Sequence, residues 1–193
     1  MSELVRAFIA VELSEEARAA LGRAIRSMEA KGLRGVRWVR SNAMHLTLKF
    51  LGEIPPAMVE KVLQALNEAC AGTAPLRLEL AGAGAFPDLA RPRVLWVGLS
   101  GELDALKALQ GRVESHMQRL GFQAEARGFS PHVTLGRVRD DVSQQERARI
   151  GEVLGRVKLE AVPSWQVVSV NLMKSTLTPD GAIYECIARV RLP

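Results

Sequence analysis

Two short segments of the chain repeat one pattern that suits acid–base chemistry. His45–Leu48 reads His-Leu-Thr-Leu and His132–Leu135 reads His-Val-Thr-Leu. Each segment lies in an apolar stretch typical of a β-strand, where residues two positions apart point to the same face. Each strand is therefore predicted to present an imidazole beside a hydroxyl, while its apolar residues face the core.

These side chains fit the cleavage of a phosphodiester. An unperturbed histidine has a pKa near 6.5, so one neutral imidazole can take a proton from water while a second, protonated one delivers a proton to the leaving oxygen. Thr47 and Thr134 are expected to donate hydrogen bonds to the non-bridging phosphate oxygens, whose charge rises in the transition state. Lys49, two residues beyond Thr47, is expected to add positive charge from the same strand face.

A metal site is the competing interpretation, because histidine is also a common ligand. Neither segment contains a carboxylate or a cysteine, and two histidines with hydroxyl neighbours make a poor ligand set for zinc or iron. The third histidine, His116, falls beside the apolar face of a predicted helix and is expected to be structural or solvent-flanking. Cys70 and Cys186 are predicted to be reduced, buried core residues. We therefore expect neither a metal nor a cofactor.

The distribution of charge also points to an anion. The formal net charge is +5 and the estimated pI is 9.7, which favours a polyanionic partner. Each histidine lies in a window without Asp or Glu, the first between Glu29 and Glu53 and the second from Ala126 to Arg139. Either window alone is typical of a solvated basic face, but the shared coincidence with a histidine favours an anion site. The cations of the two windows are Lys31, Arg34, Arg37, Arg40, Lys49, Arg127, Arg137 and Arg139.

The predicted elements occur twice in the same order. Apolar periodicity and capping signals predict, in the first half, a strand Val5–Glu12, a helix from the N-cap Ser14 to near Gly32, strands Val36–Arg40 and His45–Leu51, and a helix starting at Pro55-Pro56. A strand Leu76–Leu80 and a Gly/Pro loop, Gly82 to Arg93, separate the halves. The second half repeats the order with a strand Val94–Leu99, a helix Gly101–Leu120, strands Phe122–Ala126 and His132–Val138, and a helix opened by a capping box at Ser143.

A constant offset links the two halves. The histidines are 87 positions apart, and so are the predicted helix starts at Ser14 and Gly101. This favours a duplication that builds two similar lobes. A final hairpin is predicted from Trp165–Met173 and Ile183–Leu192 around a turn containing Pro179-Asp180-Gly181.

The predicted fold class is α+β. Two pseudo-symmetric lobes, each an antiparallel sheet packed with helices, are expected within a single domain of residues 1–193, with the active-site cleft between the sheets. A chain of 193 residues with 48% hydrophobic and 24% charged residues suits one folded domain. The N-terminal segment has no basic stretch leading into an apolar run, and no segment approaches the roughly 18 apolar residues of a membrane span. A cytoplasmic monomer without membrane contact or obligate protein partner is expected.

At these residues the sequence resembles the two-histidine (2H) phosphoesterase superfamily, and within it the bacterial and archaeal RNA 2',3'-cyclic phosphodiesterases, also called 2'-5' RNA ligases. The resemblance covers almost the whole chain. Besides the two histidine segments, it is carried in order by Arg6–Ala10, Trp38–Val39, Asn42–Glu53, Gly84–Pro87, Pro92–Trp96, Phe129–His132 and Ser175–Gly181.

The resemblance implies hydrolysis of an RNA 2',3'-cyclic phosphate end to a 2'-phosphate, without a metal, and a reverse reaction that joins ends through a 2',5' linkage. It also implies that His45 is the proton donor and His132 the proton acceptor. Arg137 matches a family position that contacts phosphate. Strict strand alternation would turn Arg137 away from the face of His132, unless the strand bulges or ends by Gly136.

Two alternatives remain open at this point. The same chemistry could act on small cyclic phosphates, such as nucleoside 2',3'-cyclic phosphates or an ADP-ribose cyclic phosphate. A different class of protein would bind RNA ends without turnover, although the two intact motifs favour the enzyme. Phe8, Phe86 and Tyr184 are candidates for stacking on a base.

Overall fold

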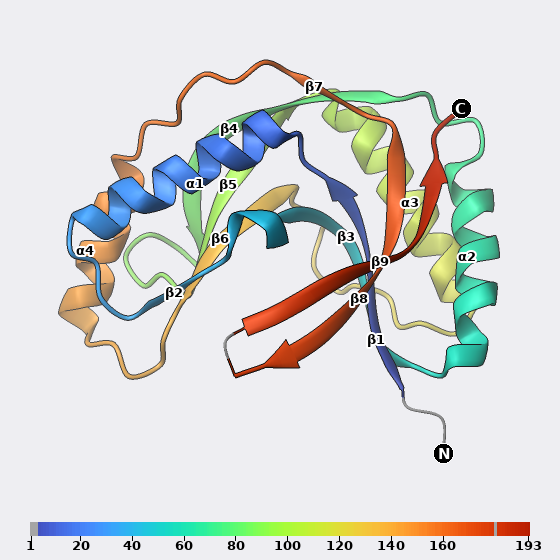
Figure 1. Ribbon diagram of the computed structural model, residues 1–193, viewed down its shortest axis with the longest axis horizontal. Helices are drawn as coiled ribbons and strands as arrows, with labels where there is room; N and C mark the ends of the chain where they lie inside the picture. Colours follow the sequence, from blue (N-terminus) through green and yellow to red (C-terminus); the bar gives the residue numbers. More distant parts are fainter. Residues whose placement is uncertain (1–3, 180) are drawn as a thin grey trace.

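A nine-stranded sheet forms the frame of the computed structural model, which describes residues 4–179 and 181–193 (Figure 1). The strands run in the order β7-β4-β5-β6-β3-β1-β8-β9, and β2 also pairs with β6. Every pairing is antiparallel. The strands are β1 Val5–Glu12, β2 Val36–Trp38, β3 His45–Ile54, β4 Leu76–Phe86, β5 Val94–Gly101, β6 His132–Val138, β7 Trp165–Val167, β8 Ser169–Thr178 and β9 Gly181–Arg191.

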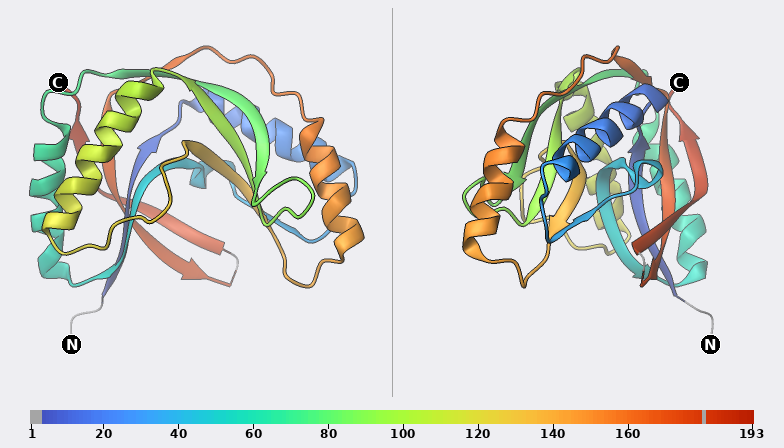
Figure 2. Two further views of the ribbon diagram at one scale, coloured as in Figure 1. Left: turned by 180° about the vertical axis from the view of Figure 1, so that it is seen from behind. Right: turned by 60° about the vertical axis from the view of Figure 1, so that its left-hand side comes forward.

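The helices lie in two pairs, one beside each lobe of the curled sheet. Figure 2 shows α1 and α4 together at one end of the molecule and α2 and α3 together at the other. In each pair, one helix comes from the first half of the chain and one from the second. The bounds are α1 Glu15–Ala30, α2 Pro56–Cys70, α3 Leu103–Arg119 and α4 Gln144–Gly155, with a short 3-10 helix η1 at Ser41–Ala43.

Because each helix pair contains one helix from each half of the chain, side-chain contacts connect the two halves. The Arg149 side chain on α4 donates to the Lys31 carbonyl just after α1 (2.8 Å), and Gln110 on α3 donates to the Leu48 carbonyl of β3 (3.3 Å). One continuous cluster of buried apolar residues runs through both halves. The predicted α+β fold class with two lobes is confirmed, with one refinement: β6 and β3 join the sheets of the lobes into one.

Local capping signals account for where the helices begin. The Ser14 hydroxyl accepts a hydrogen bond from the Ala17 amide (3.1 Å), and Ser143 accepts one from the Glu146 amide (3.2 Å). These bonds satisfy amides that lack a partner inside the helix. The predicted starts of α1 and α4 are therefore confirmed.

Three expectations about local structure are wrong. The strand predicted at Phe122–Ala126 is a loop, because side chains rather than a neighbouring strand hold its backbone. The loop predicted from Gly82 instead continues β4 as far as Phe86, since β5 pairs with it across a register shift where Gly82 takes a φ of 60°. Cys186 is exposed, because it lies on β9 at the end of the sheet order. The final hairpin is confirmed only in part. Its first strand is Ser169–Thr178 instead of Trp165–Met173, because Trp165–Val167 forms a separate strand that pairs with β4. Asp180 of its turn lies outside the described residues.

Gly151 offers a test of how α4 packs on the loop between β4 and β5. A methyl group at Gly151 would overlap the Leu89 backbone, whereas one at Gly111 on α3 would meet open space. We expect Gly151→Ala to lower the free energy of unfolding by about 1–3 kcal/mol through this overlap. The control Gly111→Ala should raise it by about 0.5–1 kcal/mol through helix propensity. Urea unfolding measures both, and a Gly151→Ala variant as stable as the parent would contradict this packing.

Candidate active site

The two histidine strands are adjacent in the sheet. Leu46 of β3 pairs with Val133 of β6 in antiparallel register, and both side chains are buried in the core. The residues on either side of this pair therefore face away from the core. This side of the sheet, which carries His45, Thr47, His132 and Thr134, is termed the inner face.

The register fixes how the four polar side chains are arranged. Continued from the pair of Leu46 and Val133, it sets Thr134 across from His45 and Thr47 across from His132. The two histidines are then diagonal neighbours, which in an antiparallel pair lie roughly 7–8 Å apart. Two imidazoles and two hydroxyls thus surround one position on the inner face.

Each histidine is held by the same local hydrogen bond. Nδ1 of His45 lies 2.9 Å from the carbonyl oxygen of Ala43, and Nδ1 of His132 lies 2.7 Å from that of Ser130. A carbonyl oxygen only accepts, so Nδ1 carries the proton in both rings. Nε2 is then the nitrogen left for chemistry: a base when the ring is neutral and an acid when it is protonated.

Aromatic side chains flank both histidines. Phe8 and Tyr184 lie with ring centroids 4.7 and 5.0 Å from that of His45. Phe86 and Trp96 lie 5.0 and 6.3 Å from that of His132. The three stacking candidates from the sequence are thus all beside a histidine. Trp96 was not among them, although its place two residues from the start of an apolar strand could have indicated it.

Lys49 does not share the inner face, so that expectation is wrong. The pairing of β1 with β3 shifts register between Thr47 and Lys49, which makes Leu48 an extra residue in β3. Alternation restarts after the bulge, and Leu48 and Lys49 are both buried. The Lys49 ammonium therefore points to α3 instead of to a phosphate on the inner face.

Lys49 instead forms a partly buried ion pair that holds the loop before His132. Its Nζ lies 2.8 and 2.9 Å from the carboxylate oxygens of Glu114 on α3 and donates to the carbonyl of Gln123 (2.9 Å). Glu114 also accepts from the Glu125 amide (3.1 Å). Burial by itself would raise the pKa of Glu114, but the hydrogen bonds from Lys49, Gln118 and the Glu125 amide outweigh it and lower the pKa.

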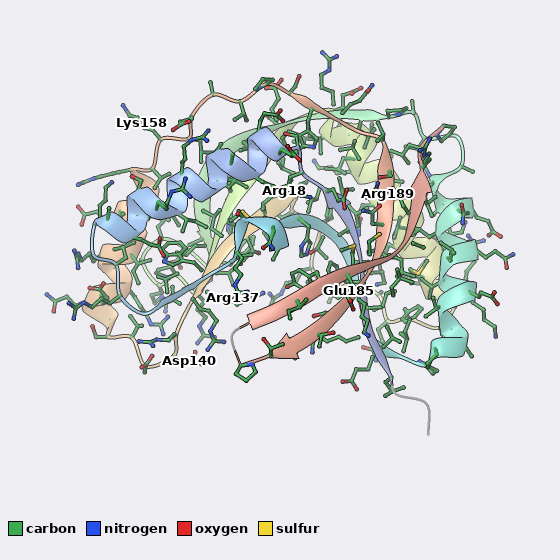
Figure 3. The ribbon with its side chains drawn as sticks, in the orientation of Figure 1. Arg18, Arg137, Asp140, Lys158, Glu185 and Arg189 are labelled. Atoms are coloured by element: carbon green, nitrogen blue, oxygen red, sulfur yellow. The ribbon has the colours of Figure 1, made fainter. Side chains whose placement is uncertain are left out.

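A matching bulge places Arg137 on the inner face. Thr134 pairs with Trp96 and Arg137 with Val94, so β6 has one extra residue, Leu135, between the two pairs. Val94 and Trp96 share a face of β5, and Trp96 contacts His132 on the inner face. Arg137 is therefore returned to this face, and it is exposed there. In Figure 3 its side chain lies beside the pair of β2 and β6.

Burial lowers the pKa of His45. Removal from water lowers its pKa below the ordinary value of 6.5, and the positive charge of Arg18 lowers it further. The hydrogen bond to Ala43 opposes this effect but does not cancel it. His45 is therefore mainly neutral at pH 7 in the free protein.

The described residues contain no group of three or more His, Cys, Asp or Glu side chains placed to hold a metal ion. His116 lies on α3, where its Nδ1 is bonded to the Arg112 carbonyl (2.8 Å) and its Nε2 lies 3.9 Å from Glu68. In the same described part of the chain, no helix is long and apolar enough to cross a membrane.

Comparison with known proteins shows that one family matches two successive segments of the chain. The family described as LigT-like phosphoesterase matches residues 11–96 and again residues 97–184. The chain belongs to the LigT-like phosphoesterases. The double match agrees with the duplication inferred from the offset of the histidines, because each copy contains one histidine segment.

Several relatives of this phosphoesterase extend over almost its full length. The RNA 2',3'-cyclic phosphodiesterase of Methanothermobacter thermautotrophicus is 31% identical over 97% of this chain and 99% of its own. That of Aquifex aeolicus is 31% identical over 96% of both. Among solved structures, TT0787 of Thermus thermophilus superposes with a TM-score of 0.77 at 29% identity, covering 97% of both chains. E. coli LigT complexed with 3'-AMP has the same fold, with a TM-score of 0.75 at 24% identity over 98% of this chain and 99% of its own.

The ion pair of Lys49 and Glu114 leads to a prediction about the stability of this phosphoesterase. Lys49→Met should lower the free energy of unfolding by about 1–3 kcal/mol, because it removes charge-assisted hydrogen bonds from the partly buried Glu114 carboxylate. The double variant Lys49→Met/Glu114→Met should recover most of the loss. Chemical denaturation measures both, and a single variant that unfolds at the parental midpoint would show that the pair is not formed.

The acidity of His45 can be measured directly. In an NMR titration of the imidazole Cε1–H signals, we expect His45 to titrate with a midpoint below 6.5, because burial disfavours its charged form. Arg18→Met should move the midpoint upward by removing a nearby positive charge. A midpoint at or above 6.5 in the parent protein would contradict the burial of this ring.

Proposed function

We propose that the protein hydrolyses RNA 2',3'-cyclic phosphate ends to 2'-phosphate ends, by metal-independent acid–base catalysis with His45 and His132. The diagonal arrangement of two imidazoles and two threonine hydroxyls around one position on the inner face carries this proposal. Full-length similarity to RNA 2',3'-cyclic phosphodiesterases supports the choice of substrate.

The reaction assigns one proton transfer to each histidine. Nε2 of neutral His132 accepts a proton from water as the water oxygen forms a bond to phosphorus. The bond between phosphorus and the 3' oxygen breaks, and Nε2–H of protonated His45 donates its proton to that oxygen. The products are a 2'-phosphate and a 3'-hydroxyl, and proton exchange with water restores both rings.

Thr47 and Thr134 stabilise the transition state in this scheme. Their hydroxyls donate to the two non-bridging oxygens, which gain negative charge as water attacks. Such donors act best when they are held in place before the reaction, and here each sits on a strand two residues from a histidine.

A lowered pKa reduces the protonated fraction of His45, and a bound substrate would increase it. A cyclic phosphate carries one negative charge, and an anion beside an imidazole favours the protonated ring. Binding of substrate is therefore coupled to uptake of a proton by His45. Protonated His45 then donates its proton to the leaving oxygen.

Ligation through a 2',5' linkage follows from the same geometry. A 5'-hydroxyl in place of water would give its proton to His132 and form a bond to phosphorus. The bond between phosphorus and the 3' oxygen breaks, His45 protonates that oxygen, and the two ends are joined through a 2',5' linkage. Small cyclic phosphates are the second candidate substrates, because the four central side chains contact only the phosphate and its ester oxygens. A non-catalytic role in binding RNA ends is a third candidate, against which the complete set of two histidines and two threonines argues.

The decisive assay incubates EDTA-treated protein with an RNA oligonucleotide that ends in a 2',3'-cyclic phosphate. We expect a 2'-phosphate product, and we expect His45→Ala and His132→Ala each to reduce kcat by about 10²–10⁴-fold, since each removes one proton transfer. His116→Ala is the matched control, because it removes the histidine on α3 that lies outside the inner face.

Each result bears on a different part of the proposal. Unchanged substrate would exclude the activity, and dependence on added metal ions would exclude the mechanism. A 3'-phosphate product would preserve the two-histidine chemistry but reverse the leaving group. A near-normal rate for either alanine variant would remove that histidine from catalysis.

A further inference from the structure

Each histidine of the inner face lies beside a different set of rings. His132 on β6 lies beside Phe86 of β4 and Trp96 of β5, two neighbouring strands of one lobe. The rings beside His45 come from β1 and β9 in the other lobe (Figure 1). The two histidines therefore have separate aromatic surroundings, and the pair of Phe86 and Trp96 is termed the β4–β5 surface.

A glycine shapes the β4–β5 surface. Gly84 of β4 pairs with Trp96, and a methyl group at Gly84 would overlap the indole ring. The indole therefore occupies the space above Gly84 and lies against the backbone of β4. The Phe86 ring lies 5.3 Å from the indole and 5.0 Å from the imidazole of His132, between centroids, and both rings are only partly buried. The uncovered parts of the two rings thus belong to the inner face beside His132.

In-line displacement at phosphorus separates the two sides of the site. The entering and the leaving oxygen lie on opposite sides of the phosphorus atom. In the proposed reaction His45 protonates the leaving 3' oxygen, so the ribose with the cyclic phosphate lies on the His45 side. His132 takes the proton from the entering oxygen, so the group that carries this oxygen lies on the His132 side, next to the β4–β5 surface.

The entering group differs between hydrolysis and ligation. In hydrolysis it is water, which gains nothing from an aromatic surface. In ligation it is the 5'-hydroxyl of a second RNA end, whose nucleoside brings a ribose and a base. Such an end has no terminal phosphate, and an uncharged surface of rings suits its base, because every base has a π face that stacks on an aromatic side chain.

We propose that Phe86 and Trp96 bind the first nucleoside of an RNA 5'-hydroxyl end and thereby form an acceptor site for 2',5' ligation. This inference rests on the proposed function and names the second substrate of the same site. With its base on the β4–β5 surface, the nucleoside directs its 5' oxygen toward Nε2 of His132. The 5'-hydroxyl proton passes to His132, the 5' oxygen bonds to phosphorus, and the 3' oxygen leaves with the proton of His45, so ligation needs no further reactant.

The test measures ligation and hydrolysis in the same reaction. The protein is incubated with a 5'-phosphorylated RNA oligonucleotide that ends in a 2',3'-cyclic phosphate, and with increasing concentrations of a second oligonucleotide that begins with a 5'-hydroxyl. The readout is the rate of 2',5' joining divided by the rate of 2'-phosphate formation. We expect Phe86→Leu and Trp96→Leu each to lower this ratio by roughly 5–100-fold at low acceptor concentration, because leucine has no ring on which a base can stack.

Two further variants separate stacking from a general loss of structure. Phe86→Tyr keeps an aromatic ring and should keep the ratio close to that of the parent. Phe50→Leu is the matched control, because the Phe50 side chain is 65% exposed on the His45 side, with its ring 6.2 Å from that of Phe8. It should leave the ratio unaltered, since any effect there falls on the cyclic phosphate end that both reactions share.

Three results would overturn the acceptor site. The first is a parental ratio in both leucine variants of the β4–β5 surface, including a fall of both rates by the same factor, which would assign the rings to the support of His132. The second is an equally large fall of the ratio in Phe50→Leu. The third is hydrolysis by the parent protein without any ligation at high acceptor concentration. Failure of the proposed function gives a different result, the absence of a 2'-phosphate product, and would overturn both proposals.

Discussion

The pairing of β3 with β6 at Leu46 and Val133 is the contact on which the site depends. It joins two lobes that each carry one histidine and one threonine of the candidate site, and it does so at the residue between them. Because both apolar side chains at this contact are buried, the histidines and threonines beside them must face the opposite way. Core packing thereby fixes the relative position of the four polar groups.

Equivalent bulges follow both histidine segments and have opposite consequences for the charges there. In β3 the bulge buries Lys49, whose ammonium neutralises Glu114 and secures the loop that leads to His132. In β6 the equivalent residue is Gly136, and the bulge returns the next residue, Arg137, to the inner face. Lys49 thus has a structural role, whereas Arg137 is exposed on the inner face, where it could contact an anion. The duplication preserved the backbone geometry and changed the use of its charges.

Electrostatics links the site to its substrate. Burial and Arg18 keep His45 neutral in the free protein, and Arg137 of the inner face lacks a carboxylate partner in the described part of the chain. Both features disfavour additional positive charge in the free protein, and a nearby negative charge would relieve each of them. The folded protein therefore has an arrangement of charges that suits the anionic ligand proposed for it.

The sequence by itself determined the chemical groups and the plan of the fold. The two histidine segments, their 87-residue offset and the serine caps of α1 and α4 are local patterns whose meaning depends on strand alternation and helix ends. Only the tertiary structure decided which side chains meet. A bulge depends on the neighbouring strand, so alternation alone misplaced Lys49 and left Arg137 undecided. The position of Phe86 and Trp96 beside His132 and the low pKa of His45 likewise arise from strand pairing and burial between residues distant in the chain, which local patterns do not encode.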